Sequence, residues 1–143
     1  MADPPALLNV KVIGSESYAN VLPLLHEVRH ALAHYHDSGE TTTIDLRRIP
    51  MTERDEEELE GFLGVGEVSI DIQALGPTQI RETQYPAVWH IVHFNADGDI
   101  AGKFVTVAAI PDLVMTPRED AARGLRALTE RLADLTQDQG TNQ

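Results

Sequence analysis

The segment that decides the fold is Gly64-Val65-Gly66-Glu67-Val68-Ser69-Ile70, where the sequence changes from a helical to an extended pattern. Residues 52–63 before it are acidic and carry apolar residues at helical spacing, whereas residues 68–72 after it alternate apolar and polar side chains. Glycine often ends a helix, and a second glycine frees the backbone to turn. The spacing of the two glycines fits no phosphate-cradling loop, so the segment predicts a joint between helix and strand. Such a joint does not need an acid at Glu67.

The pattern on the amino-terminal side of this joint predicts a strand, a helix, a second strand and a second helix. Residues 6–13 and 41–46 are short apolar or β-branched runs, which are typical of strands. A helix is expected over residues 17–35, because its apolar residues recur at spacings of three and four and form one stripe. These residues are Val21, Leu24, Leu25, Val28, Leu32 and Tyr35. Pro23 is better tolerated in the first turns than in mid-helix, so Asn20 is the alternative start. Thr52 and Asp55 predict a capping box at the start of the acidic helix.

The carboxyl-terminal side predicts more strands and a final helix. Residues 80–94 are extended, with Pro86 expected at a bulge or an edge because proline cannot donate to a ladder. Residues 95–99 predict a hairpin turn and residues 100–110 its partner strand. The final helix begins near Thr116 and presents four leucines on one face. They are Leu125, Leu128, Leu132 and Leu135. The order β-α-β-α-β-β-β-α predicts an α+β fold, with helices packed against a largely antiparallel sheet.

The composition predicts one domain over residues 1–143, with frayed ends at residues 1–5 and 138–143. The absence of cysteine excludes disulfides, thiolate metal sites and a cysteine nucleophile in this sequence. The first residues resemble no signal peptide, and no stretch has the roughly 20 apolar residues of a membrane helix. We therefore expect a cytoplasmic protein without membrane insertion. The net charge of −12 disfavours nucleic acid as a partner and suits a basic protein surface better.

The sequence carries no motif that commits it to a reaction. It lacks a Gly-x-Ser-x-Gly elbow, a phosphate-binding loop and a dinucleotide-binding glycine pattern. We therefore expect a protein that is not an enzyme and needs no cofactor. His26, His30 and His34 recur at i, i+4 and i+8, and histidines at this helical spacing can share nickel or zinc. The alternative is a solvated helix face, since exposed faces collect polar residues.

A second group of polar and aromatic residues follows in the extended segments after the joint. If these segments pair, Glu67 could lie on one sheet face with Arg81 or Glu82. Trp89, the only tryptophan, could then anchor a partner together with Tyr85, because Trp, Tyr and Arg dominate binding hot spots. In the alternative, Trp89 packs in the core and the charged residues face solvent. An enzyme of unknown reaction is a further hypothesis, which a deep pocket where Glu67 and Arg81 converge would support.

Two blocks in these segments resemble the HupH/HyaF family of hydrogenase expression and formation proteins. The residues that match are Leu63, Gly64, Gly66, Glu67, Val68 and Ser69 in an L-G-x-G-E-V-S stretch, then Ile80, Glu82, Thr83, Pro86, Val88 and Trp89 in an I-x-E-T-x-x-P-x-V-W stretch, and finally Ile110-Pro111. The match covers about residues 59 to 111. The two blocks in this order and this close together are fairly specific, whereas either one alone would be weak.

The resemblance implies an accessory protein for the maturation of an uptake nickel–iron hydrogenase. Such a protein would assist assembly by binding an immature subunit, with the iron–sulfur-bearing small subunit favoured, beside other maturation proteins. Family members are longer and contain a second region related to this one. The single copy here leaves open whether the chain acts alone, as a homodimer or beside another accessory protein. The family supplies no catalytic residues, so Glu67, Glu82 and Trp89 are the expected centre of a recognition surface. The alternative function is nickel delivery by the histidine face.

Overall fold

The computed structural model describes residues 18–141. The strand predicted over residues 6–13 lies outside this range. The described residues divide into two units, one ending at Pro111 and the other beginning at Asp112. Each unit is described by itself. None of the described helices is long and apolar enough to cross a membrane.

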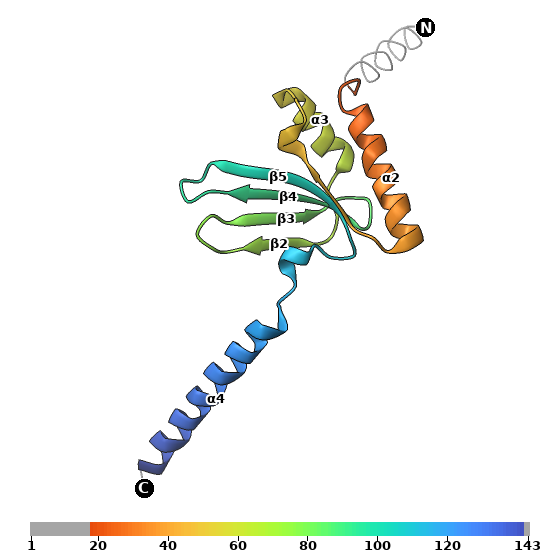
Figure 1. The fold of residues 1–143 in the computed structure, drawn as a ribbon. Helices are drawn as coiled ribbons and strands as arrows, with labels where there is room; N and C mark the ends of the chain where they lie inside the picture. Colours follow the sequence, from red (N-terminus) through yellow and green to blue (C-terminus); the bar gives the residue numbers. More distant parts are fainter. Residues whose placement is uncertain (1–17, 142–143) are drawn as a thin grey trace, which may run out of the picture. The chain divides into compact units, whose positions relative to one another are not determined.

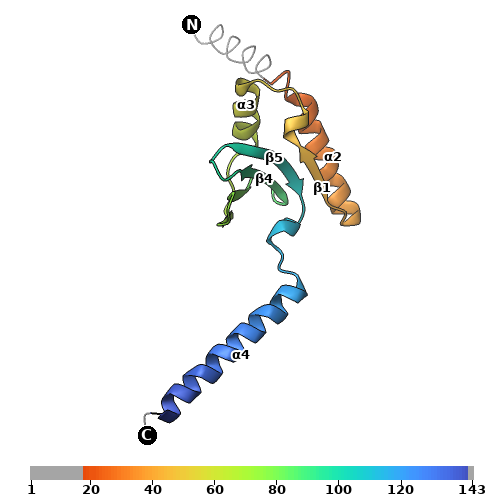
Figure 2. The same cartoon turned by 60° about the vertical axis from the view of Figure 1, so that its left-hand side comes forward.

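The first unit is built on a five-stranded sheet in which every neighbouring pair is antiparallel (Figures 1 and 2). Its strands, in spatial order, are β1 (Thr42–Asp45), β5 (Ile100–Val107), β4 (Val88–Phe94), β3 (Thr78–Glu82) and β2 (Ser69–Ile72). The predicted α+β fold with an antiparallel sheet is confirmed. The extended run over residues 80–94, however, is two strands rather than one. Pro86 lies in the turn between β3 and β4, where its missing N–H leaves no gap in a ladder.

Helix α2 (Leu22–Ser38) and helix α3 (Glu53–Leu63) pack on the sheet through one apolar core (Figures 1 and 2). The core joins the predicted stripe of α2 to the apolar face of α3 and to β1, β4 and β5. Its buried residues are Val21, Leu24, Val28, Ala31, Ile44, Leu46, Leu59, Leu63, Val88, Val105 and Val107. The 3-10 helix η1 (Leu46–Arg48) follows β1 directly.

The helix boundaries follow local capping chemistry. Thr52 Oγ1 accepts the Asp55 N–H at 3.1 Å, and an Asp55 carboxylate oxygen accepts the Thr52 N–H at 2.9 Å, which confirms the predicted capping box. The bond from the Thr52 N–H holds the pKa of Asp55 below its usual value. Helix α2 begins at Leu22, later than expected, because Pro23 is suited only to the first turn.

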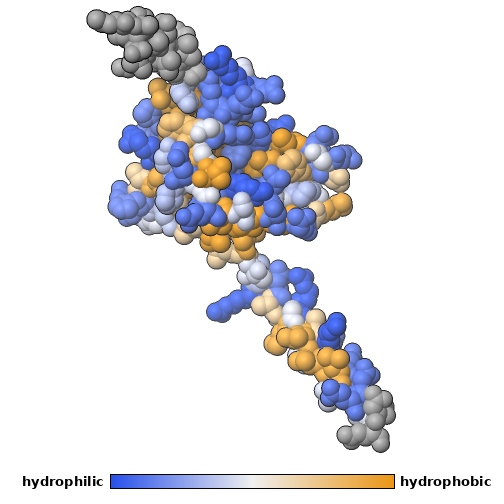
Figure 3. All heavy atoms as spheres, turned by 180° about the vertical axis from the view of Figure 1, so that it is seen from behind, coloured by the Kyte–Doolittle hydropathy of each residue, from blue (hydrophilic) through white to orange (hydrophobic). Residues whose placement is uncertain are grey.

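The second unit contains the 3-10 helix η2 (Asp112–Val114) and the 24-residue helix α4 (Arg118–Thr141). Helix α4 includes residues 138–141, where the sequence predicted a frayed end. Figure 3 shows apolar residues gathered along this helix. The exposed fractions of its leucines are 67% for Leu125, 58% for Leu128, 55% for Leu132 and 52% for Leu135.

Candidate functional site

The joint between α3 and β2 is tied to the end of strand β3. Gly64 ends α3 with a φ of 67°, and its N–H donates to Glu60 O at 2.9 Å. The Gly66 N–H then donates to Glu82 O at 2.8 Å. A Cβ at position 66 would lie 2.4 Å from Thr83 O, so only glycine allows the backbones to approach this closely. The predicted joint is confirmed.

Glu82 has a structural role in this joint. Its Oε1 accepts the Glu67 N–H at 2.8 Å and the Val68 N–H at 3.3 Å. The carboxylate therefore supplies the acceptor that two loop amides would otherwise have to find in water. The segments that contain Glu67 and Arg81 do pair, with Ser69 opposite Arg81.

Arg81 and Trp89 also bond within the chain. Arg81 Nη2 donates to Asp71 Oδ1 at 2.8 Å, and Nη1 donates to the carbonyls of Ile70 and Ile80, each at 3.1 Å. Trp89 is 4% exposed, and its indole N–H donates to Ala108 O at 3.0 Å. A side chain this buried does not present a surface to a partner. Trp89 therefore packs in the core, as the alternative hypothesis expected, and does not anchor a partner.

An apolar concavity lies between α2, the end of α3 and the turn that follows β3. We call it the α2–α3 groove. Its volume is about 430 Å³. Its lining residues are Tyr18, Leu22, Leu25, His26, Val28, Arg29, Leu32, Phe62, Leu63, Tyr85 and Val88. Val28, Leu63 and Val88 belong to the buried core, so the floor of the groove is rigid.

Aromatic rings form one wall of the α2–α3 groove. Phe62 stacks on Tyr85 with ring centroids 5.9 Å apart, and Tyr18 meets Phe62 edge-on at 6.0 Å. Phe62 is 41% exposed and Leu22 is 49% exposed, so apolar surface remains open to solvent. Sequence reasoning included Tyr85 but missed Tyr18, Leu22 and Phe62. Leu22 could have been noticed, since it lies off the stripe that the core requires.

The turn between β3 and β4 separates this groove from a polar hollow. Tyr85 lines the groove, whereas Gln84 and Pro86 line a hollow of about 440 Å³ together with Glu67 and Glu82. Glu67 is exposed. Arg81 lines a third, smaller hollow with Glu60 and His90. Glu67 and Arg81 therefore do not converge on one cavity, as an active site built from them would require.

A charged cluster lies between α3 and the sheet. Lys103 Nζ is 3.2 Å from Glu56 Oε2 and 3.9 Å from Glu60 Oε1. His90 Nε2 is 3.8 Å from Glu60 Oε1, too far for a hydrogen bond, and has no hydrogen-bond partner among the described residues. Burial lowers the pKa of His90, a shift that the neighbouring Glu60 opposes and Lys103 assists.

The histidines of α2 do not gather into a metal site. His26 lines the α2–α3 groove, and His34 Nε2 lies 2.7 Å from Glu40 Oε2. Over residues 18–141, no group of three or more His, Cys, Asp or Glu side chains is placed to hold a metal ion. The solvated-face alternative therefore describes His26, His30 and His34 better than the nickel-site hypothesis.

Known proteins share both the sequence pattern and the fold. Residues 18–135 match the family model of the HupH hydrogenase expression protein, C-terminal conserved region. The hydrogenase expression/formation protein HupQ of Azotobacter chroococcum mcd 1 is 33% identical over 99 residues, which are 69% of this chain and 34% of that protein. HupH of Rhizobium leguminosarum bv. viciae is 29% identical over 101 residues, 71% of this chain and 36% of that protein. The chain thus spans about a third of the length of these curated relatives.

A solved structure resembles the chain over most of its length. The hydrogenase expression protein HupH from Thiobacillus denitrificans ATCC 25259 superimposes with a TM-score of 0.77 at 44% identity. The similarity covers 80% of this chain and 96% of the solved chain. Together with the family match, it places the two sequence blocks around the joint on a shared fold. The chain belongs to the family defined by the C-terminal conserved region of the HupH hydrogenase expression protein.

Proposed function

We propose that this protein is a non-enzymatic assembly factor that binds an immature subunit of an uptake nickel–iron hydrogenase in the cytoplasm. The family supports a place in hydrogenase expression and formation. The α2–α3 groove is the observation that carries a binding role, because it is an open apolar surface above a rigid core. The small subunit is the favoured partner, beside other maturation proteins. The proposal includes no resident cofactor.

The chemistry of the groove suits an apolar segment of an incompletely folded protein. Stacked Phe62 and Tyr85 offer large rigid area at little cost in conformational entropy. The exposed His26 and Arg29 line the same groove and can pair with polar groups that flank the bound apolar residues. An immature subunit exposes such segments until its own core closes.

Two of the residues expected from the sequence remain as contact residues in this proposal. Tyr85 contacts the bound segment directly in the groove. Glu67 lies beyond the turn formed by residues 84–86 and would contact a basic group of the same partner. Arg81, Glu82 and Trp89 support the surface through the hydrogen bonds that hold the joint and the sheet, with Trp89 buried and the other two partly exposed.

Binding to purified immature small and large subunits tests the proposal. We expect Phe62→Ala to weaken binding at least tenfold, because it removes the central aromatic contact of the wall. Leu75→Ala is the matched control, since Leu75 is 92% exposed and is not part of the groove. No binding to either subunit at low salt would refute the proposed function. Equal losses in the two variants would refute the groove as the site.

The charge of the chain adds a kinetic expectation. A net charge of −12 should attract a basic surface over a distance, and salt screens this attraction. The association rate should therefore fall as salt rises from about 0.05 to 0.5 M, while the dissociation rate changes little. An association rate that does not depend on salt would exclude electrostatic steering by this surface.

A further inference from the structure

Helix α4 carries a narrow apolar seam with no partner among the described residues of its own unit, 112–141. The seam consists of Ala121, Leu125, Leu128, Leu132 and Leu135, which alternate spacings of four and three residues along the 24-residue helix. Each of the four leucines is at least half exposed. An isolated helix gains little stability in water from propensity alone, so an apolar stripe of this kind requires a covering surface.

The width of the seam indicates what covers it. A helix that packs on a globular core presents about three apolar positions per heptad, whereas a two-stranded coiled coil uses only positions a and d. With Leu125 at a and Leu128 at d, the leucines occupy a and d alone. The flanking positions hold small or polar residues. These are Ala122, Gly124, Thr129, Arg131, Thr136 and Asp138.

The polar groups beside the seam also suit a helical partner. Thr129 Oγ1 donates to Leu125 O at 2.7 Å, and Thr136 Oγ1 donates to Leu132 O at 3.0 Å. Both hydroxyls are therefore satisfied within the helix and can lie at the edge of a dry interface. Spacings of three and four residues are self-complementary, because the knobs of one helix fit the holes of an identical helix.

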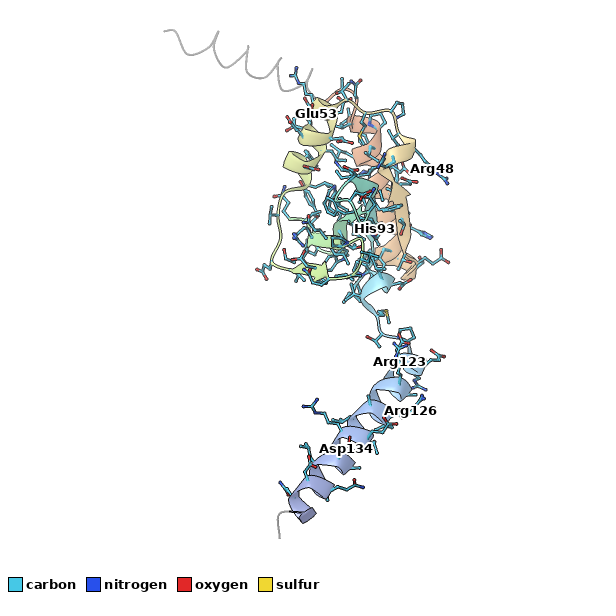
Figure 4. All side chains as sticks on the ribbon, turned by 90° about the vertical axis from the view of Figure 1, so that its left-hand side faces the viewer. Arg48, Glu53, His93, Arg123, Arg126 and Asp134 are labelled. Carbon is cyan, nitrogen blue, oxygen red and sulfur yellow. The ribbon has the colours of Figure 1, made fainter. Side chains whose placement is uncertain are left out.

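The charge of α4 permits pairing between two identical chains. The helix contains four arginines and five acidic residues, a formal charge of −1, whereas the whole chain carries −12. Figure 4 shows Arg123, Arg126 and Asp134 as side chains of both signs along this helix. Two α4 helices therefore repel one another far less than the acidic remainder of two chains would.

We propose that α4 binds α4 of a second copy of this chain, with the leucine seams facing one another in a two-stranded coiled coil. The seam spans about 21 Å along the helix axis, at 1.5 Å per residue from Ala121 to Leu135. Two heptads form a short coiled coil, so the dimer dissociates on dilution. The α2–α3 groove takes no part in this contact, and the inference does not depend on the proposed function.

Sedimentation equilibrium of the full chain from about 1 to 100 μM tests this pairing. The wild-type chain should pass from monomer to dimer across the series. The double variant Leu128→Ala and Leu132→Ala removes four leucines from each dimer and should raise the dissociation constant roughly a hundredfold or more. Alanine preserves helix propensity, and circular dichroism checks that α4 remains helical.

A charge-based pair of variants makes the test specific to the seam. Leu128→Glu with Leu132→Glu should abolish the dimer, whereas Ala127→Glu with Ala133→Glu adds the same charge on the opposite face and should leave it intact. A wild-type chain that stays monomeric at 100 μM would overturn the inference, because a surface other than a second α4 would then cover the seam. If both seam variants still formed the dimer, the two chains would meet through another surface, and the inference would be wrong.

Discussion

The side chain of Glu82 lies against the loop that contains Glu67, and its Oε1 accepts the Glu67 N–H at 2.8 Å. The two acids therefore have different roles, although both belong to the sequence blocks that resemble the HupH/HyaF family. The half-buried Glu82 binds two amides of the loop, while the Glu67 side chain is exposed, and both residues line the same hollow. This relationship separates stability from recognition and makes the two separately testable.

Replacing Glu82 by alanine should destabilise the fold by about 1–2 kcal/mol, because the Glu67 and Val68 amides lose their common acceptor. Glu82→Gln keeps a carbonyl acceptor and should therefore lose less stability than Glu82→Ala. Urea denaturation followed by the fluorescence of Trp89, the only tryptophan, measures both changes. Glu67→Ala is the control and should change the free energy of unfolding by less than about 0.5 kcal/mol. A Glu67→Ala loss as large as that of Glu82→Ala would contradict these roles.

Gly66→Ala should cost about 3 kcal/mol of stability. The added methyl would lie 2.4 Å from Thr83 O and 2.6 Å from Glu82 Oε1, so the joint must move away from β3. Gly61→Ala is the matched control in α3, where a Cβ meets nothing within 4 Å. That substitution should stabilise the protein by about 0.5–1 kcal/mol, since alanine is the better helix former. If Gly66→Ala were as stable as Gly61→Ala, the prediction would be wrong, and the joint would be loosely held.

Ala87→Gly should not destabilise the protein and should gain up to about 1 kcal/mol. Ala87 has a φ of 76°, a left-handed conformation in which its Cβ is strained, and its carbonyl accepts the Ala108 N–H. Glycine removes this strain but loses entropy on folding, so the net gain is modest. Ala33→Gly, at an exposed position within α2, should instead cost about 1 kcal/mol. Thermal unfolding of the two variants gives the comparison, and a loss in both would be inconsistent with strain at Ala87.

The stability of the protein should fall at mildly acidic pH partly because of His90. Burial lowers the pKa of His90 in the folded protein, so the unfolded chain takes up the proton more readily. The free energy of unfolding should therefore be insensitive to His90 above its ordinary pKa of about 6.5 and should decrease below it. Glu60, Glu56 and Lys103 face His90, and the two carboxylates moderate the effect.

Denaturation of wild type and His90→Gln between about pH 5 and 8 isolates this contribution. The stability of His90→Gln should decline less steeply below about pH 6.5, because glutamine takes up no proton. The comparison of slopes cancels the carboxylates that titrate in both proteins. Identical slopes in the two proteins would mean that burial of His90 does not disfavour its charged form.

Local sequence chemistry was enough to place most elements of the first unit. Thr52 and Asp55 act through bonds only three residues apart, and the stripe on α2 reflects helical periodicity, so neither depends on distant residues. The division of residues 80–94 into two strands was missed. Pro86 signals a break in a ladder, but the φ of Ala87 and the return of the chain as β4 follow from packing against β5.

The sequence by itself determined the α+β class, the capping box of α3 and the two blocks that identify the family, because these depend on residue order and short-range bonds. Only the tertiary structure decided which side chains are available at the surface. It buried the hydrogen bond of Trp89, it bound the half-buried Glu82 to two loop amides, and it brought Tyr18, Phe62 and Tyr85 together from three distant segments. Exposure depends on contacts between residues far apart in the chain, and no local pattern encodes it.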